Sequence, residues 1–156
     1  MENIEEKAQF LKEEYTQGLS EIDADTPRKW GKMNLQQMIE HMADYVRIAS
    51  GKMAAPNVTP EDVLPRMQKF LDSEKPFPEN TPNVLMPAEP TPAKHATKEE
   101  AITELQAEID DFFAVYEQNE SKITSNPFFG DLDFERQVQL LHKHATHHLR
   151  QFGVEV

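Results

Sequence analysis

The chain has 156 residues and no cysteine, and 28 acidic side chains against 16 basic ones give it a formal net charge of −12. The acidic balance argues against nucleic acid and anionic membranes as partners, and no apolar run approaches the ~20 residues of a membrane span. The length predicts a single domain, residues 1–156, and the acidic N-terminus, which lacks the basic start of a signal peptide, predicts a cytoplasmic protein.

Two amphipathic helices are predicted in the first third of the chain. Apolar side chains recur at helical spacing over about residues 2–20, and Asp25-Thr26-Pro27 ends that segment. A second apolar stripe follows Asn34, which is a good N-cap, and Gly51 suits the C-terminal end of that helix. Trp30 lies in the connection between the two helices, where we expect it to pack against the core.

A proline-rich crossover is predicted next, because residues 52–96 contain 9 of the 11 prolines. Thr59 and Pro60 resemble a helix start, and apolar residues up to Leu71 give that short helix one buried side. From Lys75 to Ala96 prolines recur too often for a helix, so we expect irregular chain. Too few apolar residues are present for a separate core. We therefore expect one long connection, which either covers a site as a lid or supports a homodimer.

Two more helices are predicted in the last third. Thr97-Lys98-Glu99-Glu100 is a capping box, and helical spacing continues over about residues 98–120. An aromatic turn, residues 126–130, follows, and Asp131 or Asp133 then caps the last helix. No alternation typical of β-strands has useful length. The predicted fold class is all-α: a four-helix bundle with a long Pro-rich crossover that carries a short helix between the second and third long helices.

Four of the six histidines lie between His142 and His148, in the last predicted helix. On an ideal helical wheel His144 and His148, four residues apart, share a face at the edge of the apolar side. That spacing lets two imidazoles bind one transition metal. A third imidazole is available from His41, at the edge of the apolar stripe of the second helix, and metal sites in bundles are built from facing helices. Without cysteine, the ligands must be His, carboxylate or water.

The remaining histidines are expected elsewhere. The wheel turns His147 toward solvent and places His142 beyond the opposite border of the apolar side. His95 lies in the proline-rich crossover, where we expect it to be exposed. Each histidine could instead be an ordinary half-buried or surface residue, and for His41 taken alone that interpretation is the favoured one.

Three neutral imidazoles on a divalent ion leave one coordination position open, which is typical of catalytic rather than structural sites. Ni²⁺ or Zn²⁺ suits such ligands best, and Fe²⁺ or Mn²⁺ is compatible with them. Gln151 and Asp44, each three residues from a candidate ligand, are candidate outer-shell groups. Gln151 could equally be a packed polar residue without such a role. For Asp44 a solvated position on the surface is favoured over an outer-shell role. The sequence identifies no strong nucleophile or general base.

This pattern resembles the DinB-like, or YfiT-like, superfamily of metalloenzymes. Members combine a four-helix bundle with a His on the second helix and an H-x-x-x-H pair on the last, often followed closely by Gln. The matching segments here are Trp30 to His41 and His144 to Gln151, and the turn N-P-F-F-G and the ending H-x-x-H-H-L-R-Q-F-G mark a branch of the superfamily. Many relatives have Arg-Gly-Gln after the final His, whereas this chain has Leu149-Arg150-Gln151, a departure that concerns substrate contacts rather than ligands.

The resemblance implies that His41, His144 and His148 bind Ni²⁺ or Zn²⁺. It further implies a hydrolase or a thiol S-transferase that acts on a small molecule, with a low-molecular-weight thiol as a partner. One alternative is a protein that binds a metal and a small molecule without turnover. Another is a bundle that has kept the fold without the metal. The superfamily name does not imply DNA binding, and the net charge argues against it.

Overall fold

A computed structural model describes residues 1–81, 83 and 85–156, and it confirms the all-α fold class. The first long helix consists of three continuous segments, α1 (Ile4–Gln9), the π-helical η1 (Phe10–Glu14) and α2 (Tyr15–Ser20). The other helices are α3 (Leu35–Ser50), α4 (Leu64–Asp72), α5 (Lys98–Gln118) and α6 (Phe134–Gln151). None of these described helices has the length and apolar character needed to cross a membrane.

The predicted caps position the long helices. Asn34 forms a capping box with Gln37 at the start of α3, and Gly51 ends that helix with a φ of 87°. The side chain of Thr97 accepts a hydrogen bond from the backbone N–H of Glu100, which starts α5. Of the two aspartates considered for α6, Asp133 is the cap, because its side chain accepts from the backbone N–H of Arg136.

The short helix of the crossover begins later than predicted, at Leu64 rather than beside Thr59 and Pro60. Thr59 instead donates its hydroxyl to the carbonyl of Phe128 at 2.7 Å, and the N–H of Val58 donates to the carbonyl of Pro127 at 2.8 Å. These bonds tie this part of the chain to the aromatic turn, so the Thr59 hydroxyl does not cap the helix. The described residues from 75 to 96 form no helix or strand, as predicted.

Two three-residue strands flank the aromatic turn, and these were not predicted. Strand β1 (Thr124–Asn126) pairs antiparallel with β2 (Gly130–Leu132), with Ser125 opposite Asp131. Oδ1 of the buried Asn126 accepts from the backbone N–H groups of Phe128 and Phe129, at 2.8 and 3.1 Å, and so closes the turn. Strands of three residues are too short to show an alternating pattern in sequence.

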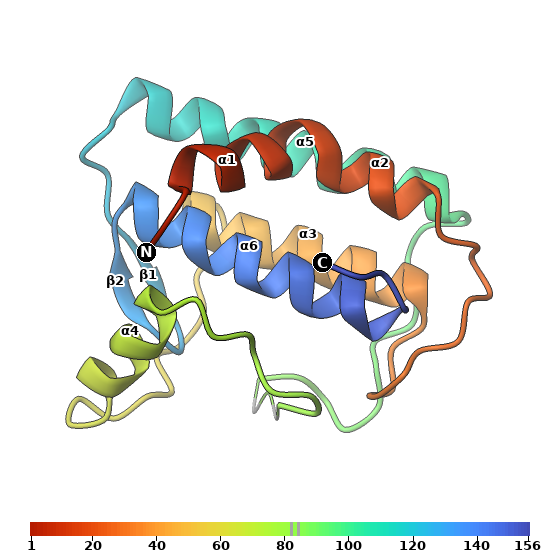
Figure 1. Cartoon of the computed structure of the whole chain (residues 1–156), viewed down its shortest axis with the longest axis horizontal. Helices are drawn as coiled ribbons and strands as arrows, with labels where there is room; N and C mark the ends of the chain where they lie inside the picture. Colours follow the sequence, from red (N-terminus) through yellow and green to blue (C-terminus); the bar gives the residue numbers. More distant parts are fainter. Residues whose placement is uncertain (82, 84) are drawn as a thin grey trace.

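Helix α6 lies at the centre of the molecule. Figure 1 shows it beside α3, with the first long helix and α5 above the pair and α4 with the crossover below. Because neighbours surround it, α6 buries polar side chains as well as apolar ones, among them Gln137, Gln139, Lys143, His144, His147, His148 and Gln151. This position brings the last helix and α3 together along the stretch that carries the predicted ligands.

Candidate metal centre

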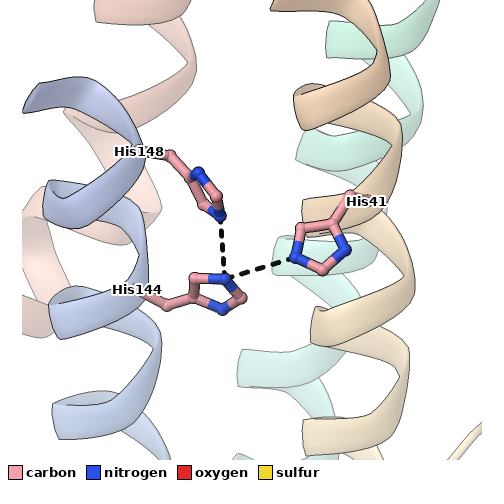
Figure 2. A group of neighbouring side chains, drawn as sticks. All are labelled: His41, His144 and His148. Atoms are coloured by element: carbon pink, nitrogen blue, oxygen red, sulfur yellow. Dashed lines mark hydrogen bonds between the residues drawn. The ribbon is translucent and has the colours of Figure 1, made fainter. Parts of the chain in front are cut away.

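Three histidines from two facing helices form a compact cluster. His41 comes from α3, and His144 and His148 come from α6 one helical turn apart (Figure 2). Nε2 of His144 lies 2.9 Å from Nε2 of His148 and 3.3 Å from Nε2 of His41. One ring nitrogen from each residue lies within 4.8 Å of the other two, an arrangement that could hold a metal ion. The structure therefore brings together the three ligands predicted from sequence.

Burial keeps these imidazoles neutral at pH 7. It lowers the pKa of His41 to about 4 and that of His148 to about 3, from an ordinary value of 6.5. The pKa of His144 is well below 6.5, first because the ring is buried and then because the other two rings would repel a second positive charge. Neutral rings each offer a lone pair, which is the form that binds a metal.

The hydrogen bonds around the cluster fit a cation at its centre. Nδ1–H of His148 donates to Oε1 of Gln151 at 2.8 Å, so Nε2 of that ring carries a lone pair toward its neighbours. Nε2 of His144 faces two ring nitrogens, and a neutral ring nitrogen cannot both donate and accept. The nitrogen separations resemble the about 3.3 Å expected between two imidazoles on a tetrahedral ion with bonds of about 2.0–2.1 Å.

Gln151 connects the cluster to the segment before α3. Its Nε2 donates to the carbonyl of Trp30 at 2.8 Å while its Oε1 holds His148. The side chain is 3 % exposed, so it has little access to solvent. Of the two alternatives left by the sequence, the structure has Gln151 in contact with a candidate ligand, as an outer-shell group would be.

Asp44 occupies a different environment. It is exposed on α3, and its Oδ1 accepts from Nη1 of Arg47 at 2.7 Å. Its charge opposes the burial effect on the pKa of His41 but does not outweigh it. The structure thus agrees with the solvated position favoured from sequence. Glu40, on the preceding turn, accepts from the backbone N–H groups of Lys94 and His95 and anchors the end of the crossover on α3.

His147 is buried, and the prediction that it faces solvent is wrong. Only 8 % of the residue is exposed, and its ring centroid lies 5.4 Å from that of Trp30 and 5.9 Å from that of Phe77. The helical wheel considers one helix against one apolar side. Here the crossover and the segment before α3 cover the other side of α6 as well, so a second face is buried.

The two other histidines lie outside the cluster. His95 is part-buried rather than exposed, because its Nε2 lies 3.2 Å from Oε2 of Glu104 and the crossover packs there against α3 and α5. His142 is half-buried, and its ring meets that of Phe10 edge-on at 5.5 Å. The structure therefore separates both from the candidate metal centre, as the sequence predicted.

Three cavities adjoin the cluster, and the crossover lines all of them. One, of about 360 Å³, includes His41 and His148 in its wall, and a second, of about 370 Å³, includes His144 and His147. A third, of about 260 Å³, includes His41 together with Glu40 and Asp44. Tyr45 lines the second cavity, with its ring 4.2 Å from that of His144. Sequence reasoning treated Tyr45 as core, although its position four residues after His41 places both on one helix face.

A larger cavity, of about 690 Å³, lies between the first long helix and α5 and is lined by none of the three clustered histidines. The candidate centre is therefore separate from it.

A family model described as the DinB superfamily matches residues 7–152 of the chain, which is nearly its whole length. No curated protein and no solved structure gives a match.

Proposed function

The chain belongs to the DinB superfamily, and from that premise we propose that it is a metal-dependent enzyme acting on a small molecule. His41, His144 and His148 would hold one divalent ion, with a coordination position open toward the adjoining cavities. The observation that carries the proposal is the convergence of their three neutral imidazoles, two of them buried and that of His41 part-buried.

The ligand set favours Ni²⁺ or Zn²⁺, since both bind imidazole well, and Fe²⁺ or Mn²⁺ is compatible with it. A divalent ion held by these residues would lower the pKa of a bound water or thiol and would polarise a substrate atom. Side chains around the cluster would orient the ligands and exclude water. Gln151 fixes the orientation and tautomer of His148, and the aromatic walls around His144 limit access of bulk water.

The reaction that we propose is thiol S-transfer or hydrolysis. Neither Asp nor Glu is present among the described residues that line the cavities beside His144 and His148, but Glu40 and Asp44 line the third cavity, beside His41. A hydrolase often uses a carboxylate to accept a proton from water, whereas a thiol ionises readily next to a divalent ion. Glu40 already accepts from the backbone N–H groups of Lys94 and His95, and Asp44 accepts from Arg47. Because both carboxylates are engaged in these bonds, thiol transfer is the favoured reaction of the two.

The same observation supports a second candidate function, a protein that binds a metal and a small molecule without turnover. A binding protein needs no general base, and the two carboxylates in the cavity beside His41 are already engaged in hydrogen bonds. Turnover separates the two functions. We expect metal-dependent transfer or hydrolysis in a panel of thiol, ester and amide substrates, abolished by His148→Ala. Binding of metal and thiol with no turnover across the panel would favour the binding protein.

The metal assignment is tested by elemental analysis of purified protein. We expect about one equivalent of Ni²⁺ or Zn²⁺ per chain in the wild type, and almost none in His144→Ala. His95→Ala is the matched control, because it removes a part-buried histidine that lies outside the cluster. Unchanged metal content in His144→Ala would overturn the assigned ligands. Equal loss in His95→Ala would show that the effect is not specific to the cluster.

A further inference from the structure

The three histidines of the cluster line two neighbouring cavities of different chemistry, and His41 also lines a third, smaller one. His144 lies in the wall of one cavity, which we call the apolar cavity, and His41 and His148 lie in the wall of the other, which we call the polar cavity. A ligand atom at the open position of the centre would therefore lie where the two cavities meet.

Five aromatic rings line the apolar cavity, and its described lining residues include no Asp, Glu, Lys or Arg. The rings come from α3, α4, the crossover and the aromatic turn, and they are Tyr45, Phe70, Phe77, Phe128 and Phe129. Its volume of about 370 Å³ is in the range of small-molecule sites. Burying a charge there would cost free energy with no partner to offset it, so the cavity suits a neutral alkyl or aryl group.

Polar side chains are more numerous around the polar cavity. Lys32, Asn80 and Gln151 line it, and its volume is about 360 Å³. Nζ of Lys32 is already within reach of the Ala88 carbonyl at 3.1 Å and the Glu89 carboxylate at 3.4 Å, so the positive charge is partly compensated. The wall therefore suits a polar, hydrogen-bonding group.

The two cavities are adjacent and have part of their wall in common. Thr81, Asn83 and His147 line both of them. We infer that the substrate is an elongated amphipathic small molecule, with a neutral alkyl or aryl group beside Tyr45 and Phe77, a polar end beside Gln151, and the reacting atom between them at the histidine cluster. The inference rests on the proposed function, since it assigns the substrate class of the same site.

The first test measures how affinity depends on the length of an alkyl chain. Ethanethiol, butanethiol and hexanethiol are titrated into zinc-loaded protein by calorimetry. We expect affinity to rise by up to about fourfold per methylene as the chain fills the apolar cavity. We expect 6-mercaptohexanoate, which places a carboxylate at the far end of the same chain, to lose this gain in affinity, because its chain cannot fill the apolar cavity without burying a charge. Affinity that does not change with chain length would overturn the inference.

The second test uses two methionines. Met67 is half-buried on α4 and lines the apolar cavity, whereas Met53 is 38 % exposed and lines neither cavity. We expect Met67→Gln to weaken hexanethiol binding several-fold and Met53→Gln to leave it unchanged, with the same metal content in both. Equal affinities in the two variants would contradict the assigned cavity. The chain-length series on the wild type needs no variant, so it decides the question if Met67→Gln does not fold.

A third measurement separates this inference from the proposed function. Butanol and hexanol, which lack a thiol, are titrated into metal-free protein. Tighter binding of hexanol supports the apolar cavity whether or not the protein is a metalloenzyme. If the protein contains its full metal content but its affinity for thiols and alcohols does not depend on chain length, the substrate class is wrong and the metal centre is still supported. If the wild type binds no metal but prefers hexanol to butanol, the proposed function is wrong and the apolar cavity is still supported.

Discussion

Gln151 holds His148 in one orientation. The imidazole Nδ1–H donates to the amide Oε1 at 2.8 Å, and both side chains are buried within one turn of α6. The same amide donates from Nε2 to the carbonyl of Trp30, so it cannot easily rotate away. This bond directs the lone pair of Nε2 into the histidine cluster, and it explains why the residue three positions after the last histidine is a glutamine.

We predict that Gln151→Leu lowers metal affinity by about 10- to 100-fold while leaving the protein folded. Leucine fills most of the space but cannot accept from Nδ1 of His148, so the ring is free to rotate and to change tautomer. Competition against a chelator of known affinity measures the change. Gln139→Leu, which also removes a buried amide of α6 but lies outside the cluster, is the control. Unchanged affinity in Gln151→Leu would show that the amide is only a packed bystander.

Gly31 lies next to the Gln151 amide, so a substitution at this position offers a second way to disturb that amide. Its φ is +79°, and a Cβ at this position would lie 2.8 Å from Nε2 of Gln151. Gly51 has a similar φ of +87°, but a Cβ there would meet Thr124 at an ordinary 3.4 Å. We expect Gly31→Ala and Gly51→Ala to share the backbone strain, about 1–2 kcal/mol, and only Gly31→Ala to weaken metal binding. Thermal unfolding and chelator competition, run on both, check the two parts.

Equal metal affinity in the two alanine variants would mean that displacement of Gln151 does not change the orientation of the His148 ring. A loss of affinity in Gly51→Ala as large as in Gly31→Ala would point to general destabilisation instead. The comparison is informative because the two glycines carry the same conformational demand and differ in the side chain that a methyl group would meet.

Local patterns were sufficient to predict the long helices and the three clustered histidines. Helical periodicity, together with Asn34, Thr97 and Asp133 as caps, determines where the helices begin. His144 and His148 meet because they are one turn apart, which is a property of α6 alone. His41 could be added because bundles place helices face to face, and its own stripe shows which side it occupies.

Contacts made by the crossover could not be predicted in the same way. Its prolines exclude a repeating conformation, so no period indicates which side chains are buried. The burial of His147 against Phe77, and that of His95 against Glu104, depend on where this irregular chain packs. The same reason applies to Thr59, whose hydroxyl bonds to the carbonyl of Phe128, a residue far away in sequence, instead of capping α4.

The two aspartates before α6 make a direct test of capping. Asp133 accepts from the backbone N–H of Arg136 at 3.0 Å, whereas Asp131 is exposed in β2. We predict that Asp133→Ala lowers the free energy of unfolding by about 1 kcal/mol, and that Asp131→Ala changes it by less than about 0.5 kcal/mol. Urea unfolding of both variants supplies the comparison. A larger effect of Asp131→Ala would contradict the assigned cap.

We predict that metal-free protein loses stability as the pH falls from 6.5 toward 5. In the folded state burial lowers the pKa of His41 and His142 to about 4 and that of His148 to about 3, against 6.5 in an unfolded chain. The unfolded chain therefore binds more protons in this window, and each such histidine contributes a slope of up to about 1.4 kcal/mol per pH unit. Urea unfolding at pH 7.5, 6.5, 5.8 and 5.0 measures how the free energy of unfolding changes with pH. His142→Gln should reduce this slope and leave the histidine cluster intact. An unchanged slope in this variant would contradict the contribution assigned to His142.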